Sequence, residues 1–169
     1  MSFNAKLAEG KVGESQIANW LKNRGHHILP VYEIEKGQYK GPAVYSSVGE
    51  SIIAPDMLIF GKGKTIWIEA KHKDAFSYHR MTGRFVTGID LHHYEQYQKI
   101  RRLVDWPVWL MFLHRGGSAK DSAKSNSGLY CGEIEYLMAN ENHRHKNHGR
   151  TGMVYWAEKV LKKLSDYPL

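Results

Sequence analysis

PDMLIFGKGKTIWIEAK, residues 55–71, is the stretch that decides the fold of this chain. Two apolar runs flank a turn that contains two glycines, which predicts a pair of antiparallel strands. A loop centred between residues 62 and 63 places Asp56 directly opposite Glu69, whether the loop has two residues or four. Lys71 follows Glu69 by two positions, so both side chains project from the same face of the strand.

This register brings two acids together. Side chains directly opposed on antiparallel strands lie roughly 4.5–5.5 Å apart, and like charges at that distance repel. A fold gains nothing from such a pair unless a cation lies between the carboxylates. The hairpin therefore predicts a metal site formed by Asp56 and Glu69, with Lys71 beside it as a base.

Length and composition indicate a single folded domain over residues 1–169. A hydrophobic content of 42% with 12% aromatic residues excludes a disordered chain. Lys and Arg number 24 against 17 Asp and Glu, and the resulting formal charge of +7 favours nucleic acid as the partner. The charge alone is also compatible with simple solubility.

Cysteine content and the lack of long apolar runs indicate the cellular compartment. Cys131 is the single cysteine, which excludes an intrachain disulfide and favours a reducing compartment. The first residues do not form the apolar run of a signal peptide. No stretch approaches the roughly 18 apolar residues of a membrane span. We expect a cytoplasmic protein with no membrane partner.

The remaining elements are read from apolar periodicity. We expect a helix over residues 12–24, a strand over 27–34, a loop or loose hairpin over 37–49, and strands over 52–60 and 65–71. Residues 73–88 show no regular pattern. Thr87 and Asp90 are candidate caps of a second helix, which ends before Pro107. Its expected apolar stripe comprises Ile89, His93, Gln96, Ile100 and Leu103.

A continuous apolar run over residues 108–113 predicts a strand buried on both faces. The helix between this strand and the one over residues 65–71 permits parallel pairing, so the sheet is expected to be mixed. Further on, we expect a mobile loop over residues 115–128, a strand over 130–137, a polar loop over 140–150 and a final helix over 153–164.

These features resemble the PD-(D/E)XK nuclease superfamily, which includes restriction enzymes and Holliday-junction resolvases. The resemblance rests on Pro55-Asp56, on Glu69-Ala70-Lys71 and on Gly13-Glu14 in the first helix. It covers residues 11–114 and implies an α/β fold: a restriction-endonuclease-like αβββαβ core with a mixed central sheet flanked by helices. Residues 115–169 would be an elaboration with a C-terminal strand and helix.

The resemblance implies a function and a set of site residues. Asp56, Glu69 and the Ala70 carbonyl would hold Mg²⁺ or Mn²⁺, and Glu14 would reach the ion directly or through water. Lys71 would orient or deprotonate the attacking water, which requires that its pKa be depressed. From the residues alone, Glu14 could equally lie at the edge of the helix stripe and reach water.

The implied activity is metal-dependent hydrolysis of DNA phosphodiester bonds by a homodimer, with structure-selective or phage-type processing preferred. The alternatives are a sequence-specific restriction-type endonuclease and a non-catalytic nucleic-acid-binding subunit. His93 and Gln96 would contact DNA or a metal-bound water, or else form a polar pair that caps the core. A histidine-rich loop, residues 143–148, is interpreted as a phosphate-contacting loop rather than a zinc site, because no cysteine lies nearby. The cations that follow the catalytic strand are the expected phosphate contacts: Lys73, Arg80 and Arg84.

Overall fold

The computed structural model describes residues 3–31, 42–61, 63–117, 125–148 and 150–169, with side chains from residue 10 onward. Its helices are α1 (Phe3–Lys22), α2 (Leu91–Val104) and α3 (Ile134–Ala139), with a short 3₁₀ turn η1 (Glu158–Val160). Its strands are β1 (His27–Pro30), β2 (Ala43–Tyr45), β3 (Ser51–Ile53), β4 (Met57–Gly61), β5 (Lys64–Lys73), β6 (Ser77–His79), β7 (Arg84–Asp90), β8 (Val108–His114), β9 (Gly128–Glu133), β10 (His143–His145), β11 (Met153–Ala157) and β12 (Lys162–Ser165).

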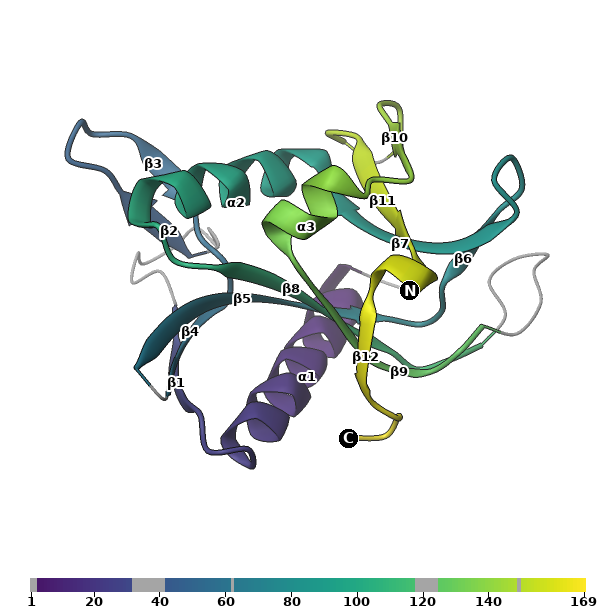
Figure 1. Ribbon diagram of the computed structural model, residues 1–169, viewed down its shortest axis with the longest axis horizontal. Helices are drawn as coiled ribbons and strands as arrows, with labels where there is room; N and C mark the ends of the chain where they lie inside the picture. Colours follow the sequence, from purple (N-terminus) through teal and green to yellow (C-terminus); the bar gives the residue numbers. More distant parts are fainter. Residues whose placement is uncertain (1–2, 32–41, 62, 118–124, 149) are drawn as a thin grey trace.

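A six-stranded mixed sheet with the order β1-β4-β5-β8-β9-β12 runs through the middle of the molecule (Figure 1). β4 and β5 pair antiparallel with Phe60 opposite Thr65 and Met57 opposite Ile68, which is the register expected from the hairpin. Asp56 and Glu69 each lie one residue beyond that last pair. β5 and β8 pair in parallel, so the expected mixed sheet is confirmed.

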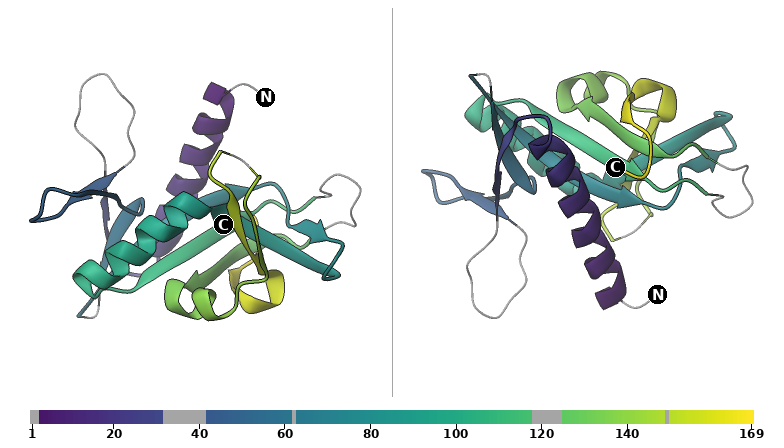
Figure 2. Two further views of the ribbon diagram at one scale, coloured as in Figure 1. Left: turned by 90° about the horizontal axis from the view of Figure 1, so that it is seen from above. Right: turned by 90° about the horizontal axis from the view of Figure 1, so that it is seen from below.

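The two long helices cover opposite faces of this sheet (Figures 1 and 2). α1 buries Ile17 and Leu21 against one face, together with Ile68 and Ala70 of β5. α2 packs on the other face, where Trp67 of β5 lies in the core. Successive residues of β5 therefore face different helices, as the alternation of a strand requires.

A second, smaller sheet has the order β10-β11-β7-β6. It corrects two expectations. Residues 73–88 are not irregular, because β6 and most of β7 lie there, and residues 153–164 form β11, η1 and part of β12 instead of one helix. Apolar residues at positions 153, 156, 160, 161 and 164 fit a helical period, but pairing of β11 with β7 buries Val154 to Ala157 almost continuously, which only a strand allows here.

The remaining boundaries shift for identifiable reasons. The strand expected over residues 52–60 is interrupted at residues 54–56, where Pro55 has no backbone N–H to donate, and this gives β3 and β4. The strand expected over 130–137 ends at Glu133, whose side chain accepts hydrogen bonds from two backbone N–H groups and caps α3. Part of the expected loop over 140–150 is β10. The expected strand and loop over residues 27–49 and the loop over 115–128 extend partly outside the described residues.

The buried face of α2 also differs from the expected stripe. Tyr94, Tyr97 and Ile100 are buried, whereas Leu103 is 49% exposed. Thr87 lies in β7 and Asp90, at the N-cap position, makes no capping hydrogen bond through its side chain. In the part of the chain that the structure describes, no helix combines the length and the apolar character needed to cross a lipid bilayer.

Candidate active site

β5 presents a row of charged side chains on the face away from α1. Glu69, Lys71 and Lys73 alternate along the strand with residues that face α1. Glu69 is 1% exposed, and the Lys71 ammonium forms an ion pair with its carboxylate. A carboxylate this deep in a folded chain is costly unless it is neutralised.

Asp56 is held directly beside this row. Its Oδ2 accepts a hydrogen bond of 2.8 Å from the backbone N–H of Ala70, which fixes the carboxylate against β5. Burial, followed by the negative charge of Glu69, raises the pKa of Asp56 to about 7. The predicted convergence of two acids and a lysine is therefore present.

The carboxylate pair fits a hard divalent cation. Neither Glu69 oxygen makes a hydrogen bond of standard geometry within the described residues, although both oxygens are buried. Two carboxylates and the Ala70 carbonyl provide the oxygen ligands that Mg²⁺ and Mn²⁺ prefer, and Mg²⁺ usually retains several waters. The described part of the chain contains no group of three or more His, Cys, Asp or Glu side chains arranged to hold a metal ion, so Glu14 is not preassembled with the pair.

Glu14 nevertheless lies within electrostatic reach of the pair. Burial and then the charge of Asp56 raise the pKa of Glu14, while Lys71 opposes them. The close approach of α1 depends on Gly13, because a Cβ at that position would lie 2.4 Å from the Cβ of His72 on β5. The helix thus brings Glu14 to the edge of the site, half-buried and within reach of solvent.

The protonation of Lys71 differs from the expectation for a base. Burial lowers the pKa of Lys71, but the charges of Glu69 and Asp56 outweigh burial and hold the pKa above its usual value. Without a cation, this lysine is an ammonium group. A cation between the carboxylates would cancel the charges that raise the pKa and leave burial, which lowers it.

α2 contributes Tyr97, which the sequence did not single out as a site residue. Burial raises the pKa of Tyr97 well above its usual value, and the charges of Glu69 and Asp56 add to the effect. The spacing of Tyr94, Tyr97 and Ile100 along one helix face was the available signal. His93 lies near the same place: burial, followed by the charge of Lys71, lowers its pKa.

The remaining residues expected to contact DNA lie at three different places in the structure. Lys73 lies next to the site, where burial and then the charge of Lys71 lower its pKa to about 8. The Gln96 side-chain oxygen accepts a 3.3 Å hydrogen bond from the backbone N–H of Ile53 and so holds β3 against α2. Arg80 and Arg84 are exposed on the smaller sheet and its turn, not beside Lys71.

A groove leads away from the site between α1 and β1. Its volume is about 1050 Å³, and Glu14 and Asp56 form part of its wall. Lys11, Lys22 and His27 also line it, so its rim carries cationic and neutral polar groups. Asp56 is thus reachable from solvent along this groove.

Comparison with known proteins finds solved structures that share the fold of this chain. No family model matches the chain, and no curated protein matches its sequence. Among solved structures, it is similar to Hjc, a Holliday junction resolvase from Archaeoglobus fulgidus, at 11% identity and a TM-score of 0.52, over 89% of this chain and 90% of the resolvase. It is also similar to D212, a nuclease from a fusselovirus, at 14% identity and a TM-score of 0.47, over 94% and 87% of the two chains. The likeness to the resolvase confirms the expected fold, and the chain has a resolvase-like α/β architecture.

Proposed function

We propose that this protein is a metal-dependent endodeoxyribonuclease that hydrolyses phosphodiester bonds. The observation that carries the proposal is the pair of facing carboxylates, Asp56 and Glu69, held within the protein with Lys71 against one of them. Packing alone does not favour such a pair, because both its burial and its mutual repulsion oppose ionisation. The arrangement is stabilised when a cation is bound.

Each residue would have a distinct role. Asp56, Glu69 and the Ala70 carbonyl would hold the ion, with Glu14 acting through water. A bound Mg²⁺ or Mn²⁺ would polarise the scissile phosphate, stabilise developing charge and supply hydroxide. Lys71 would position the attacking water against the phosphate. Tyr97, whose hydroxyl is affected by the charge of Glu69, would keep that carboxylate oriented.

The substrate we propose is DNA with a branched or otherwise irregular structure. The formal charge of +7 favours a polyanion, and the compared protein from Archaeoglobus fulgidus is named a Holliday junction resolvase. Lys73 and His93 lie beside Lys71 and would contact phosphates next to the cut. We further propose a homodimer, because cutting two strands requires two such centres.

Incubation with supercoiled plasmid and with four-way junctions tests the proposal. Cleavage is expected in Mg²⁺ and not in EDTA. Lys71→Ala should reduce the cleavage rate by roughly 10²–10⁴-fold, the usual contribution of a positioned catalytic group. Lys64→Ala is the matched control, because Lys64 is an exposed lysine at the other end of the same strand.

The outcomes separate the candidate functions. Cutting at fixed positions in linear duplex would indicate a sequence-reading endonuclease. Metal-independent binding without cutting would indicate a non-catalytic nucleic-acid-binding subunit and contradict the proposal. Equal activity in Lys64→Ala and Lys71→Ala would remove Lys71 from the mechanism.

A further inference from the structure

The smaller sheet carries a concentration of positive charge that the catalytic site does not use. Residues 77–90 and 143–157, which contain its strands and their turns, include five Arg and Lys side chains and a single acid, Asp90. Four of these five cations form no ion pair with any acid of the described residues. Arg144 is the exception among the five, because it pairs with Glu141. The five are Arg80, Arg84, Arg144, Lys146 and Arg150.

The same sheet holds a column of stacked rings. His79 of β6 stacks on His143 of β10 with ring centroids 3.8 Å apart, and His143 stacks on Tyr155 of β11 at 4.6 Å. The planes differ by 10° and 8°, respectively, so the three rings are nearly parallel. Gly88 of β7 makes this possible, because a Cβ there would lie 2.7 Å from the Tyr155 ring.

Side-chain hydrogen bonds fix the column from its edges. Nδ1 of His79 is 2.8 Å from the Thr82 hydroxyl, and Nδ1 of His143 is 2.7 Å from the Asn142 side-chain oxygen. Burial, followed by the charges of His79 and His145, lowers the pKa of His143. The column therefore consists of two half-buried histidines stacked on a buried Tyr155, and exposed lysine and arginine side chains surround it.

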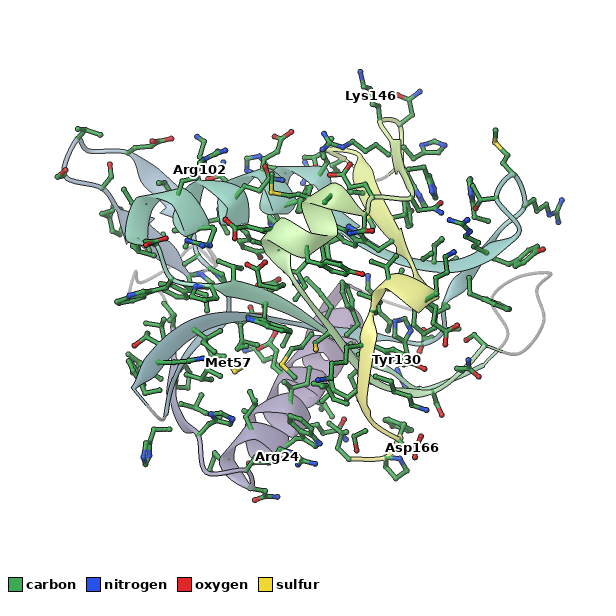
Figure 3. All side chains as sticks on the ribbon, viewed as in Figure 1. Arg24, Met57, Arg102, Tyr130, Lys146 and Asp166 are labelled. Carbon is green, nitrogen blue, oxygen red and sulfur yellow. The ribbon has the colours of Figure 1, made fainter. Side chains whose placement is uncertain are left out.

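This surface continues from the catalytic centre. Asp90, at the end of β7, lies close enough to Lys73 for its charge to affect the pKa of that lysine, and its Oδ1 accepts a 3.0 Å hydrogen bond from the Thr151 hydroxyl. Thr151 belongs to the turn between β10 and β11, and the carbonyl of Gly152 in that turn accepts from the first backbone N–H of α2. Lys146 projects outward from the tip of this turn (Figure 3).

We infer that the face formed by the His79–His143–Tyr155 column and the β10–β11 turn binds the DNA backbone beside the cut. The inference rests on the proposed function. A phosphodiester backbone fits this face because the exposed cations around the column can neutralise phosphates. The turn would hold the arm of the substrate whose scissile phosphate lies at Lys71.

The decisive experiment measures binding separately from cleavage. Fluorescence anisotropy with a labelled four-way junction in EDTA gives the affinity over a range of salt concentrations, and plasmid cleavage in Mg²⁺ is measured on the same preparations. Lys146→Ala/Arg150→Ala removes two cations from the turn. The matched control is Arg102→Ala/Lys159→Ala, which removes the same two residue types from exposed positions on α2 and η1.

We expect the turn variant to bind more weakly and its slope of log K against log salt to be smaller by about 2, since each phosphate contact contributes about 0.9. The control should keep the wild-type slope, and both variants should melt like the wild type. Equal losses in the two variants, or no loss in the turn variant, would overturn the inference. A wild type that binds through this turn but does not cut would leave the inference standing and refute the proposed activity.

Discussion

The two sheets of this molecule arrange charge in opposite ways. The six-stranded sheet brings Asp56 and Glu69 together, with Glu69 buried in its interior and Asp56 half-buried at the groove. The smaller sheet places cations on exposed strands and turns, where water and salt screen them. A buried pair of like charges lowers the stability of the empty protein, whereas exposed cations cost little until a polyanion binds.

The sequence alone is enough to suggest a function for the facing carboxylates, whereas a function for the exposed cations can be suggested only from the structure. The facing carboxylates suggest a chemical role, because their burial and mutual repulsion would otherwise only destabilise the fold. The function of the exposed cations can be inferred only from their position around the stacked rings of the smaller sheet. Mutations in the first region should change catalysis and stability together, and mutations in the second should change binding alone.

The largest effect is expected from Asp56→Asn. An amide keeps the acceptor for the Ala70 N–H but cannot hold a cation as a carboxylate does, so cleavage of plasmid in Mg²⁺ should fall to background. Asp105→Asn, at an exposed position with positive φ that Asn also adopts, is the control and should cut at the wild-type rate. Substantial cutting by Asp56→Asn would show that this carboxylate does not bind the essential ion.

The same substitution should stabilise the metal-free protein. Because the pKa of Asp56 rises from 3.8 in the unfolded chain to about 7 in the fold, its contribution to stability is greatest below pH 3.8 and is lost as the pH rises through 7. Asp56→Asn should therefore be more stable by about 2–4 kcal/mol at pH 8, and the gain should vanish near pH 4. Urea unfolding in EDTA at both pH values measures this, and a destabilised variant at pH 8 would contradict the account.

A third effect concerns His114, where the two sheets meet. This histidine on β8 is fully buried, stacks on Phe76 just before β6, and has no hydrogen-bond partner at either ring nitrogen among the described residues. Burial, then the charge of Lys73, lowers its pKa to about 3. Because the unfolded chain binds this proton more readily than the folded protein, the free energy of unfolding falls as the pH drops below 6.5. The loss is about 1.4 kcal/mol per pH unit until the pH nears 3.

His114→Phe should remove that acid sensitivity while keeping the stack on Phe76. The difference in unfolding free energy between wild type and variant, measured in urea, should grow by about 2 kcal/mol between pH 6.5 and pH 5 in favour of the variant. A constant difference across this range would mean that the histidine is protonated in the folded protein.

The smallest effect is expected from Gln96→Ala. Loss of the hydrogen bond from Ile53 should lower the unfolding free energy by about 1 kcal/mol and leave the cleavage rate at saturating DNA unchanged. This separates support of β3 from contact with the substrate. A loss of cleavage without a loss of stability would assign Gln96 to the DNA interface.

The sequence predicted the parts of the fold, and the placement of the candidate site residues, that depend on residues close together in the chain. The hairpin register followed from one turn, and it fixed the positions of Asp56, Glu69 and Lys71. β7 and β11 were missed because their pairing joins segments more than sixty residues apart, which periodicity within either segment cannot reveal. Tyr97 was missed as a site residue because a buried tyrosine on a helix has the same pattern whether it packs or contacts a carboxylate.

Diffraction from crystals soaked in Mn²⁺, recorded for anomalous scattering, tests the central claim most directly. We predict one anomalous peak between the carboxylates of Asp56 and Glu69, within bonding distance of both and of the Ala70 carbonyl. A peak elsewhere, or no peak at a Mn²⁺ concentration that supports cleavage, would contradict the assignment of these carboxylates as the catalytic metal site.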